Sequence, residues 1–262
     1  YVNVLNLIQY MHDKYYYEEA EMALIDTDVR RTFATGIAGF SHVIDSLSAI
    51  KYAKVKVVRD ECGLATGFET EGDFPKYGND EDAGDDLAIR LANHFYEEIH
   101  PYHDIFGAPF LTAFMGISNY IPMGRVLGAT PDGRKHGEPS SEGVSPYVGT
   151  DQSTPLAAMR SSAKLNQEVH SGGTLLNLRL SPELVATKRG QANLGGMIQT
   201  LFALGGFHVQ FNCISSETLR DAQAHPENYR DLLVRVAGYS TQFVNLSRAM
   251  QDAIIARTEH RG

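Results

Sequence analysis

Apolar and polar residues follow two different periods along the chain, and these periods predict where helices and strands form. Apolar positions at mostly helical spacing run through residues 1–24. Asp26-Thr27-Asp28 is typical of a helix N-cap, so a second helix is predicted to begin near Val29. Further helical patterns occupy Val43–Lys54, Asp85–Ile99, Leu156–Leu165, Leu194–Leu204, Thr218–His225 and the tail Gln251–Thr258.

Short runs of alternating or continuous apolar residues lie between these helices and predict strands. Val55–Arg59 and Ala65–Glu69 alternate in hydropathy on either side of a turn at residues 60–63. Phe110–Asn119 is a continuous apolar run, which is typical of a buried strand in a parallel sheet. Two more strands are predicted at Thr174–Leu180 and Phe207–Ile214.

Proline and glycine interrupt these patterns between residues 122 and 155, at Pro122, Gly124, Gly128, Pro131, Gly133, Gly137, Pro139, Gly143, Pro146, Gly149 and Pro155. The segment is too long for a simple connection between two elements, and loops of that length are usually functional or disordered. Apolar residues are scattered through it, so we expect an ordered, packed loop.

Composition and charge exclude several classes of protein. With 262 residues, 43% hydrophobic and 21% charged, the chain has the composition of a soluble globular protein. A net charge of −9 and a pI near 5.5 argue against nucleic acid or an anionic membrane as the main partner. Two cysteines are too few for a disulfide framework, and we expect a cytoplasmic protein. Because the chain begins at Tyr1 inside a helical pattern, we expect it to be a piece of a longer polypeptide.

Few residues are candidates for metal binding or thiol chemistry. His94, His100 and His103 are close in sequence, but no HExxH or CxxC motif accompanies them, so surface histidines are predicted and no metal. Cys62 lies on the turn among acidic neighbours, which disfavour a thiolate. Cys213 falls inside the last predicted strand, and we expect neither cysteine to be catalytic.

The segment Leu233–Thr241 combines aliphatic and β-branched residues with one glycine, Gly238, and predicts a strand that enters a tight loop. A turn glycine with positive φ is the simplest interpretation of Gly238. Arg235 and Tyr239 flank it, and their side chains could supply hydrogen bonds to the loop.

The residues around Gly238 also resemble a known motif. Arg235-Val236-Ala237-Gly238-Tyr239, followed by Phe243 and the helical tail, resembles the radical-bearing loop of the glycyl radical enzymes. The resemblance extends over nearly the whole chain. Tyr10–Tyr15, residues 31–32 and 36–39, and Asp45–Val55 are similar to the pyruvate formate-lyase (formate C-acetyltransferase) branch, and Thr130–Arg134 and Ala163–Leu165 are shared more widely. From about Gly128 onward, Gly143–Pro146, Ser171–Asn177 and Arg257–His260 look more like the dehydratase and decarboxylase branches.

The resemblance implies a fold and a site. The fold is α/β, the second half of a ten-stranded α/β barrel with an inserted glycyl-radical loop. Residues 1–130 would belong to the barrel domain and residues 131–262 to the glycine radical domain. Gly238 would store the radical after a radical-SAM activating enzyme removes an α-hydrogen, and Arg235 and Tyr239 would support the loop. The catalytic cysteine would lie outside this chain.

The proposed chemistry explains why the radical residue is a glycine. The α-carbon radical is stabilised only if the centre flattens into conjugation with both flanking peptide groups, which a Cβ would resist. A stored radical must also be kept from water and oxygen, so we expect the loop to be buried, with its polar groups paired.

The resemblance leaves three functions open. The first is an oxygen-sensitive, homodimeric enzyme that cleaves pyruvate with coenzyme A to acetyl-CoA and formate. The second is a dehydratase or decarboxylase of another small hydroxylated molecule. The third is a non-catalytic module that donates its glycine loop to a damaged partner. A Cys-Cys pair upstream would favour the first and Cys-x-Glu would favour dehydration, because a leaving hydroxyl needs a general acid or base.

Overall fold

The computed structural model describes residues 1–116 and 118–260. Its first half contains α1 (Val2–Tyr16), α2 (Glu18–Ile25), β1 (Phe33–Ile37), α3 (Phe40–Tyr52), β2 (Lys54–Arg59), β3 (Ala65–Glu71), α4 (Asp82–Ile99), β4 (Phe110–Phe114) and α5 (Tyr120–Val126). Its second half contains α6 (Pro155–Ala163), β5 (Gly173–Leu180), α7 (Pro182–Val185), α8 (Lys188–Ala203), β6 (His208–Asn212), α9 (Ser216–Ala224), η1 (Pro226–Asn228), β7 (Leu233–Arg235), β8 (Ser240–Gln242), η2 (Phe243–Asn245), α10 (Arg248–Ala256) and β9 (Glu259–His260).

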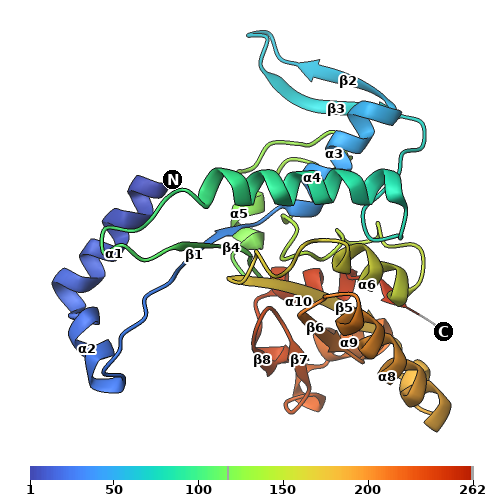
Figure 1. Cartoon of the computed structure of the whole chain (residues 1–262). Helices are drawn as coiled ribbons and strands as arrows, with labels where there is room; N and C mark the ends of the chain where they lie inside the picture. Colours follow the sequence, from blue (N-terminus) through green and yellow to red (C-terminus); the bar gives the residue numbers. More distant parts are fainter. Residues whose placement is uncertain (117, 261–262) are drawn as a thin grey trace.

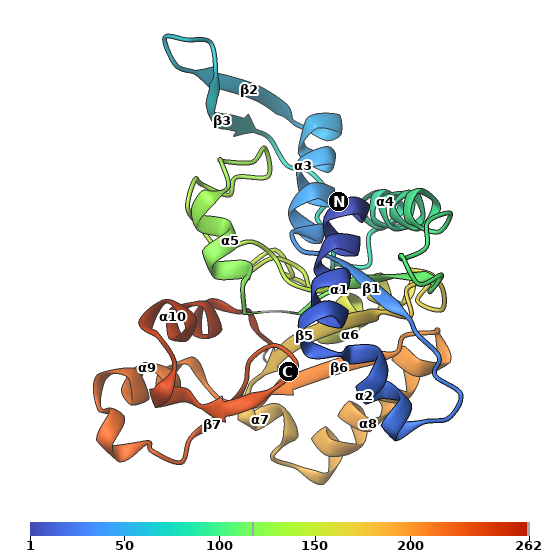
Figure 2. The ribbon, with the colours of Figure 1, turned by 90° about the vertical axis from the view of Figure 1, so that its left-hand side faces the viewer.

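A parallel sheet runs through the molecule (Figures 1 and 2). Within the described residues it has five strands, in the order β1–β4–β5–β6, with β9 also paired to β5. On one edge of β5, β4 pairs with residues 173–174 and β9 pairs with residues 179–180. The Val144 amide donates to the Leu175 carbonyl (2.9 Å), and the Asn177 amide donates to the Ser145 hydroxyl (2.9 Å). The 140–148 loop therefore fills the gap that β4 and β9 leave along β5.

The larger apolar core joins the sheet to the helices around it. Phe40 and Ile44 of α3, Phe114 of β4 and Leu176 of β5 are buried in this core. The rings of Phe40 and Phe114 lie 4.5 Å apart between centroids. Each such side chain contributes roughly 1.5–3 kcal/mol when it is fully buried. The core thus fixes the sheet on which the 140–148 loop rests.

A second apolar core lies under the C-terminal elements. It combines Tyr120 and Ile121 of α5 with Leu219 of α9, Val234 of β7 and Ile254 of α10. Figure 2 shows β7, α9 and α10 together beside the sheet. The β2–β3 hairpin, in contrast, projects away from the body (Figure 1). No helix in the described part of the chain has the length and apolar character needed to cross a bilayer.

Most predicted elements are present, and three expectations are wrong. No helix begins near Val29; residues 33–37 form β1, which pairs with β4 along its whole length. Asp26 instead accepts from the Asp28 amide (3.0 Å), a local turn that imitates a helix cap. The helical pattern over residues 1–24 is broken at Tyr17, whose φ is +53°.

The third error concerns two strands that are shorter than predicted. β4 ends at Phe114, and residue 117 of the predicted strand Phe110–Asn119 lies outside the described residues. β6 ends at Asn212, so Cys213 lies beyond the strand and is exposed. The predicted packed loop over residues 122–155 is confirmed for residues 140–145, which are buried against β5, whereas residues 122–126 belong to α5.

Candidate functional site

The segment that contains Gly238 forms a short antiparallel hairpin, which we call the glycine hairpin (residues 233–242). β7 and β8 pair Leu233 with Gln242 and Arg235 with Ser240. The Val236 amide donates to the Tyr239 carbonyl (2.9 Å) and closes the turn. Gly238 lies in this turn with φ +80°, a conformation that other residues rarely adopt. A Cβ built on Gly238 would meet no atom within 4 Å, so the conformation alone favours glycine here.

The polar side chains of β6 attach the glycine hairpin to the sheet. The Asn212 amide group donates to the Arg235 carbonyl (2.7 Å) and accepts from the Arg235 amide (2.8 Å). The Arg235 Nε donates to Gln210 Oε1 (2.7 Å). Gln210 and Asn212 are two residues apart on a strand, so they lie on the same face. Side chains on this face of β6 therefore hold the glycine hairpin against the sheet.

Apolar contacts fix the other side of the glycine hairpin. Val234, Val236 and Ala237 are buried in the second core. The Gln251 amide group on α10 donates to the Phe243 carbonyl (3.1 Å), just after the hairpin ends. Helix α10 therefore folds back onto the residues that precede and follow Gly238.

The described residues bury the base of the glycine hairpin and leave its tip open, so the expected burial of the whole radical loop stays a prediction. The residues before the tip are buried, but Gly238 is exposed and Tyr239 is 42% exposed. The cause is geometric: the core covers the base of the hairpin, while the turn extends beyond it. Of the two flanking residues that the sequence singled out, Arg235 contacts β6, whereas within the described residues the Tyr239 hydroxyl has no hydrogen-bond partner.

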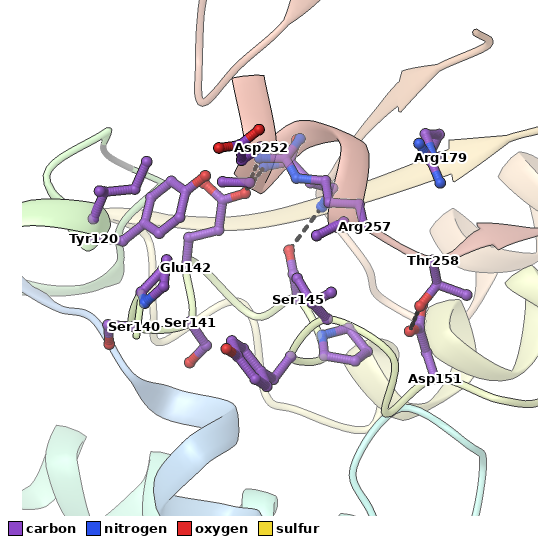
Figure 3. A pocket seen from close by; sticks show the side chains of 18 of the residues that line it. Tyr120, Ser140, Ser141, Glu142, Ser145, Asp151, Arg179, Asp252, Arg257 and Thr258 are labelled. Atoms are coloured by element: carbon purple, nitrogen blue, oxygen red, sulfur yellow. Dashed lines mark hydrogen bonds and ion pairs between the residues drawn. The ribbon is translucent and has the colours of Figure 1, made fainter. Parts of the chain in front are cut away.

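A pocket of about 380 Å³ adjoins the C-terminal part of α10 (Figure 3). Its walls are α5, the 137–148 loop, the end of β5, and the C-terminal part of α10 with the residues after it. Its polar lining includes Tyr120, Ser141, Glu142, Asn177, Arg179 and Arg257. This volume suits a small molecule.

Arg257 connects this pocket to the glycine hairpin. Arg257, at the end of α10, donates through Nη2 to Glu142 Oε1 and to the Val236 carbonyl (3.1 Å). The Asn177 side chain donates to the same Glu142 oxygen (3.0 Å). Figure 3 shows Glu142 between Tyr120 and Arg257. Arg257 thus contacts both the pocket wall and the residue two positions before Gly238.

Burial controls the ionisation of these groups. It raises the pKa of Glu142, an effect that the Arg257 guanidinium and the Asn177 amide oppose. Burial also raises the pKa of Tyr120 to about 12, so this phenol stays protonated at neutral pH. Among the described residues, Ser141 Oγ, Glu142 Oε2 and Arg257 Nη1 are buried without a hydrogen-bond partner. A ligand with hydroxyl or carboxyl groups could use this unmet capacity.

A second polar group closes the far end of the pocket. The Thr258 hydroxyl donates to Asp151, and the His260 Nε2 lies 3.0 Å from the other Asp151 oxygen. The Gly149 amide donates to Thr258 Oγ1 (3.1 Å). These bonds fasten the residues after Arg257 to the 140–151 segment.

Neither cysteine lines the pocket or belongs to the glycine hairpin. Cys62 is exposed on the turn between β2 and β3. Nearby protein atoms partly shield the Cys213 thiol from water, which raises its pKa and disfavours a thiolate. In the described part of the chain, no group of three His, Cys, Asp or Glu side chains could hold a metal ion. Sequence reasoning did not single out Glu142, Asn212 or Arg257. The sequence motifs Gly143–Pro146 and Arg257–His260 indicate similarity to the dehydratase and decarboxylase branches, but not the contacts of Glu142 and Arg257.

Comparisons with known proteins agree with this geometry. The family model "Pyruvate formate lyase-like" matches residues 1–124, and the model "Glycine radical" matches residues 140–244. Formate acetyltransferase 1 of Escherichia coli (strain K12) is 41% identical over 98% of this chain and 35% of the relative. The chain belongs to the glycyl radical enzyme family.

Solved structures of the family are also similar. The B12-independent glycerol dehydratase from Clostridium butyricum superposes with a TM-score of 0.75 at 38% identity, over 87% of this chain and 31% of that chain. The hydroxyproline dehydratase from Clostridioides difficile gives 0.78 at 34% identity, over 89% and 31%. The predicted fold class is confirmed: the chain forms part of the ten-stranded α/β barrel of this family, and it spans about a third of these relatives' length.

Proposed function

We propose that the chain is the C-terminal part of an oxygen-sensitive glycyl radical enzyme in which Gly238 stores the radical. The observation that carries the proposal is the geometry of the glycine hairpin. Gly238 has a backbone conformation that favours glycine, and β7, the strand that leads to it, is fixed to β6 and to the second core. In this proposal, an activating enzyme of the radical-SAM class removes one hydrogen atom from the Gly238 α-carbon.

The stored radical would then be passed to a cysteine by the transfer of one hydrogen atom. The Gly238 α-carbon takes a hydrogen atom from a cysteine thiol, so the glycine is restored and a thiyl radical forms. That cysteine lies outside this chain in the proposal, as the family resemblance implies. Cys62 is on the β2–β3 turn, and Cys213 follows β6.

The reaction that we propose first is the cleavage of pyruvate with coenzyme A to acetyl-CoA and formate. It is supported by the 41% identity to formate acetyltransferase 1 over nearly the whole chain. The working enzyme would be a homodimer with a small-molecule substrate.

Dehydration of a small hydroxylated molecule is the second candidate. The similarity to two dehydratases supports it. So does Glu142, a buried carboxylate in the pocket wall whose Oε2 has no hydrogen-bond partner among the described residues and could accept a proton from a substrate hydroxyl. The two candidates therefore differ in the use of this carboxyl.

Electron paramagnetic resonance of the full-length polypeptide tests the common proposal. After anaerobic treatment with a radical-SAM activating enzyme, we expect a doublet from the single remaining α-hydrogen of Gly238, and no doublet from Gly238→Ala. A silent spectrum, with the activating enzyme shown to work on another family member, would refute radical storage. Product analysis with pyruvate plus coenzyme A, and separately with glycerol or hydroxyproline, then distinguishes the two reactions.

A further inference from the structure

Arg257 occupies an unusual position between two parts of the fold. Its side chain is 11% exposed and that of Glu142 is 8% exposed, so both charges are largely removed from water. One nitrogen, Nη2, donates both to Glu142 and to the Val236 carbonyl. Val236 is the first residue of the turn that contains Gly238, and its amide closes that turn.

Glu142 is itself rigidly attached to the sheet. The Asn177 amide on β5 donates to it (3.0 Å), and the next residues bond to the same region of the sheet. The Gly143 amide donates to the Met115 carbonyl (3.0 Å), and the Val144 amide donates to the Leu175 carbonyl (2.9 Å). A continuous series of contacts therefore runs from β5 through Glu142 and Arg257 to the turn.

The ion pair explains why the Arg257 side chain stays in this buried position. A buried guanidinium without a partner would be strongly unfavourable, and Glu142 supplies the compensating charge. The ion pair keeps the Arg257 head group inside the protein, next to the Val236 carbonyl, instead of in solvent. Hydrogen bonds from a charged donor are stronger than those between neutral groups.

We propose that Arg257 is a positioning residue for Gly238, held by Glu142, so that the sheet determines where the glycine turn lies. This inference rests on the proposed function for its catalytic meaning, because a stored radical is useful only at a defined distance from its thiol partner. The contacts of β6 with Arg235 fix the base of the glycine hairpin, whereas Arg257 fixes the turn itself.

Hydrogen exchange measured by mass spectrometry on the full-length polypeptide tests this role. In Arg257→Lys, the flexible ammonium cannot hold its hydrogens in the fixed plane from which Nη2 donates to both Glu142 and the Val236 carbonyl. We expect amide exchange in peptides covering residues 236–239 to rise about tenfold, as for the loss of one charge-assisted hydrogen bond. Peptides covering β5 should be unchanged. The matched control is Arg248→Lys on the same helix, an exposed residue paired with Asp252, which should change neither region.

A second variant keeps the test decisive if Arg257→Lys does not fold. Glu142→Gln retains an oxygen that can accept from Arg257 but removes the charge, so a smaller rise in exchange is expected, again confined to residues 236–239. Exchange there at the parental rate in a folded variant would overturn the proposal. An equal rise in β5 would also overturn it, because Arg257 would then act only on general stability.

Spectroscopy separates this inference from the proposed function. If the parent polypeptide shows no glycyl doublet, radical storage fails, while the exchange data still decide whether Arg257 positions the turn. If the parent shows the doublet and the exchange result is as expected, we expect a reduced radical yield in Arg257→Lys. An unchanged yield together with unchanged exchange would leave Arg257 with no positioning role.

Discussion

The substitution Gly238→Ala separates the folding role of this glycine from its proposed radical role. The backbone at Gly238 has φ +80°, where an L-residue is strained by about 1–2 kcal/mol. The added Cβ would meet no atom within 4 Å, so no steric term adds to this cost. We therefore expect the free energy of unfolding to fall by about 1–2 kcal/mol. The variant should fold and yet give no glycyl doublet after activation.

The chain offers a closely matched control for this prediction. Gly205, which follows α8, has φ +92° and equally open space around its Cβ position. Gly205→Ala should therefore lose a similar amount of stability but keep the doublet. A contrasting case is Gly143, whose Cβ would lie 2.1 Å from the Leu175 carbonyl oxygen. Gly143→Ala must displace the 140–148 loop and should be far more destabilising than either.

Urea unfolding of the three variants under anaerobic conditions gives the comparison. The reasoning would be refuted if Gly238→Ala lost much more stability than Gly205→Ala, since that would reveal contacts at the tip that the structure does not contain. A doublet that survives in Gly238→Ala would place the radical on another residue.

Two further predictions concern the sheet and the core. Asn212→Ala removes both hydrogen bonds to the backbone of Arg235 and should lower the free energy of unfolding by about 2–3 kcal/mol. Urea unfolding measures this loss against the exposed control Asn245→Ala, and equal losses in the two variants would contradict the prediction. Burial raises the pKa of Asp45 to about 7, with the Asp132 charge adding to the effect, so the folded state binds a proton that the unfolded state releases above pH 4. The stability that this bound proton gives the folded state therefore falls as the pH rises from about 4 to 7. Asp45→Asn, which can still accept from the Tyr77 amide, should gain about 2.5 kcal/mol relative to the parent between pH 5 and pH 8, and a constant difference would contradict the assignment.

Local patterns were sufficient for elements whose contacts are close in sequence. The β2–β3 hairpin was predictable because alternation and the turn residues agree, and the Asp60 carboxylate accepts from the amides of Cys62 and Leu64 in that turn. Helix α4 was predictable in the same way, from one amphipathic pattern. Near Val29, in contrast, the local N-cap signal was overridden by β4, which pairs with β1 from 77 residues away.

The candidate site shows the same limit more clearly. Gly238 and its neighbours could be identified because the motif is contiguous. Arg257 could not, since its partners Val236 and Glu142 lie 21 and 115 residues away and meet it only after α10 folds back. The exposure of Gly238 was equally invisible, because it depends on how far the turn extends beyond the second core.

The structure suggests how one loop can meet two opposed requirements of the proposed function. Radical storage needs a fixed backbone position, whereas hydrogen removal by a second enzyme needs access to the α-carbon. In the glycine hairpin these requirements fall on different residues: Val234, Val236 and Arg235 carry the buried and hydrogen-bonded contacts, and Gly238 carries almost none. Because Arg257 bonds to the turn through Val236 rather than through Gly238, it can fix the position of the α-carbon without covering it. Substitutions at the anchoring residues should therefore change where the radical is held, and substitutions at Gly238 should change whether it forms.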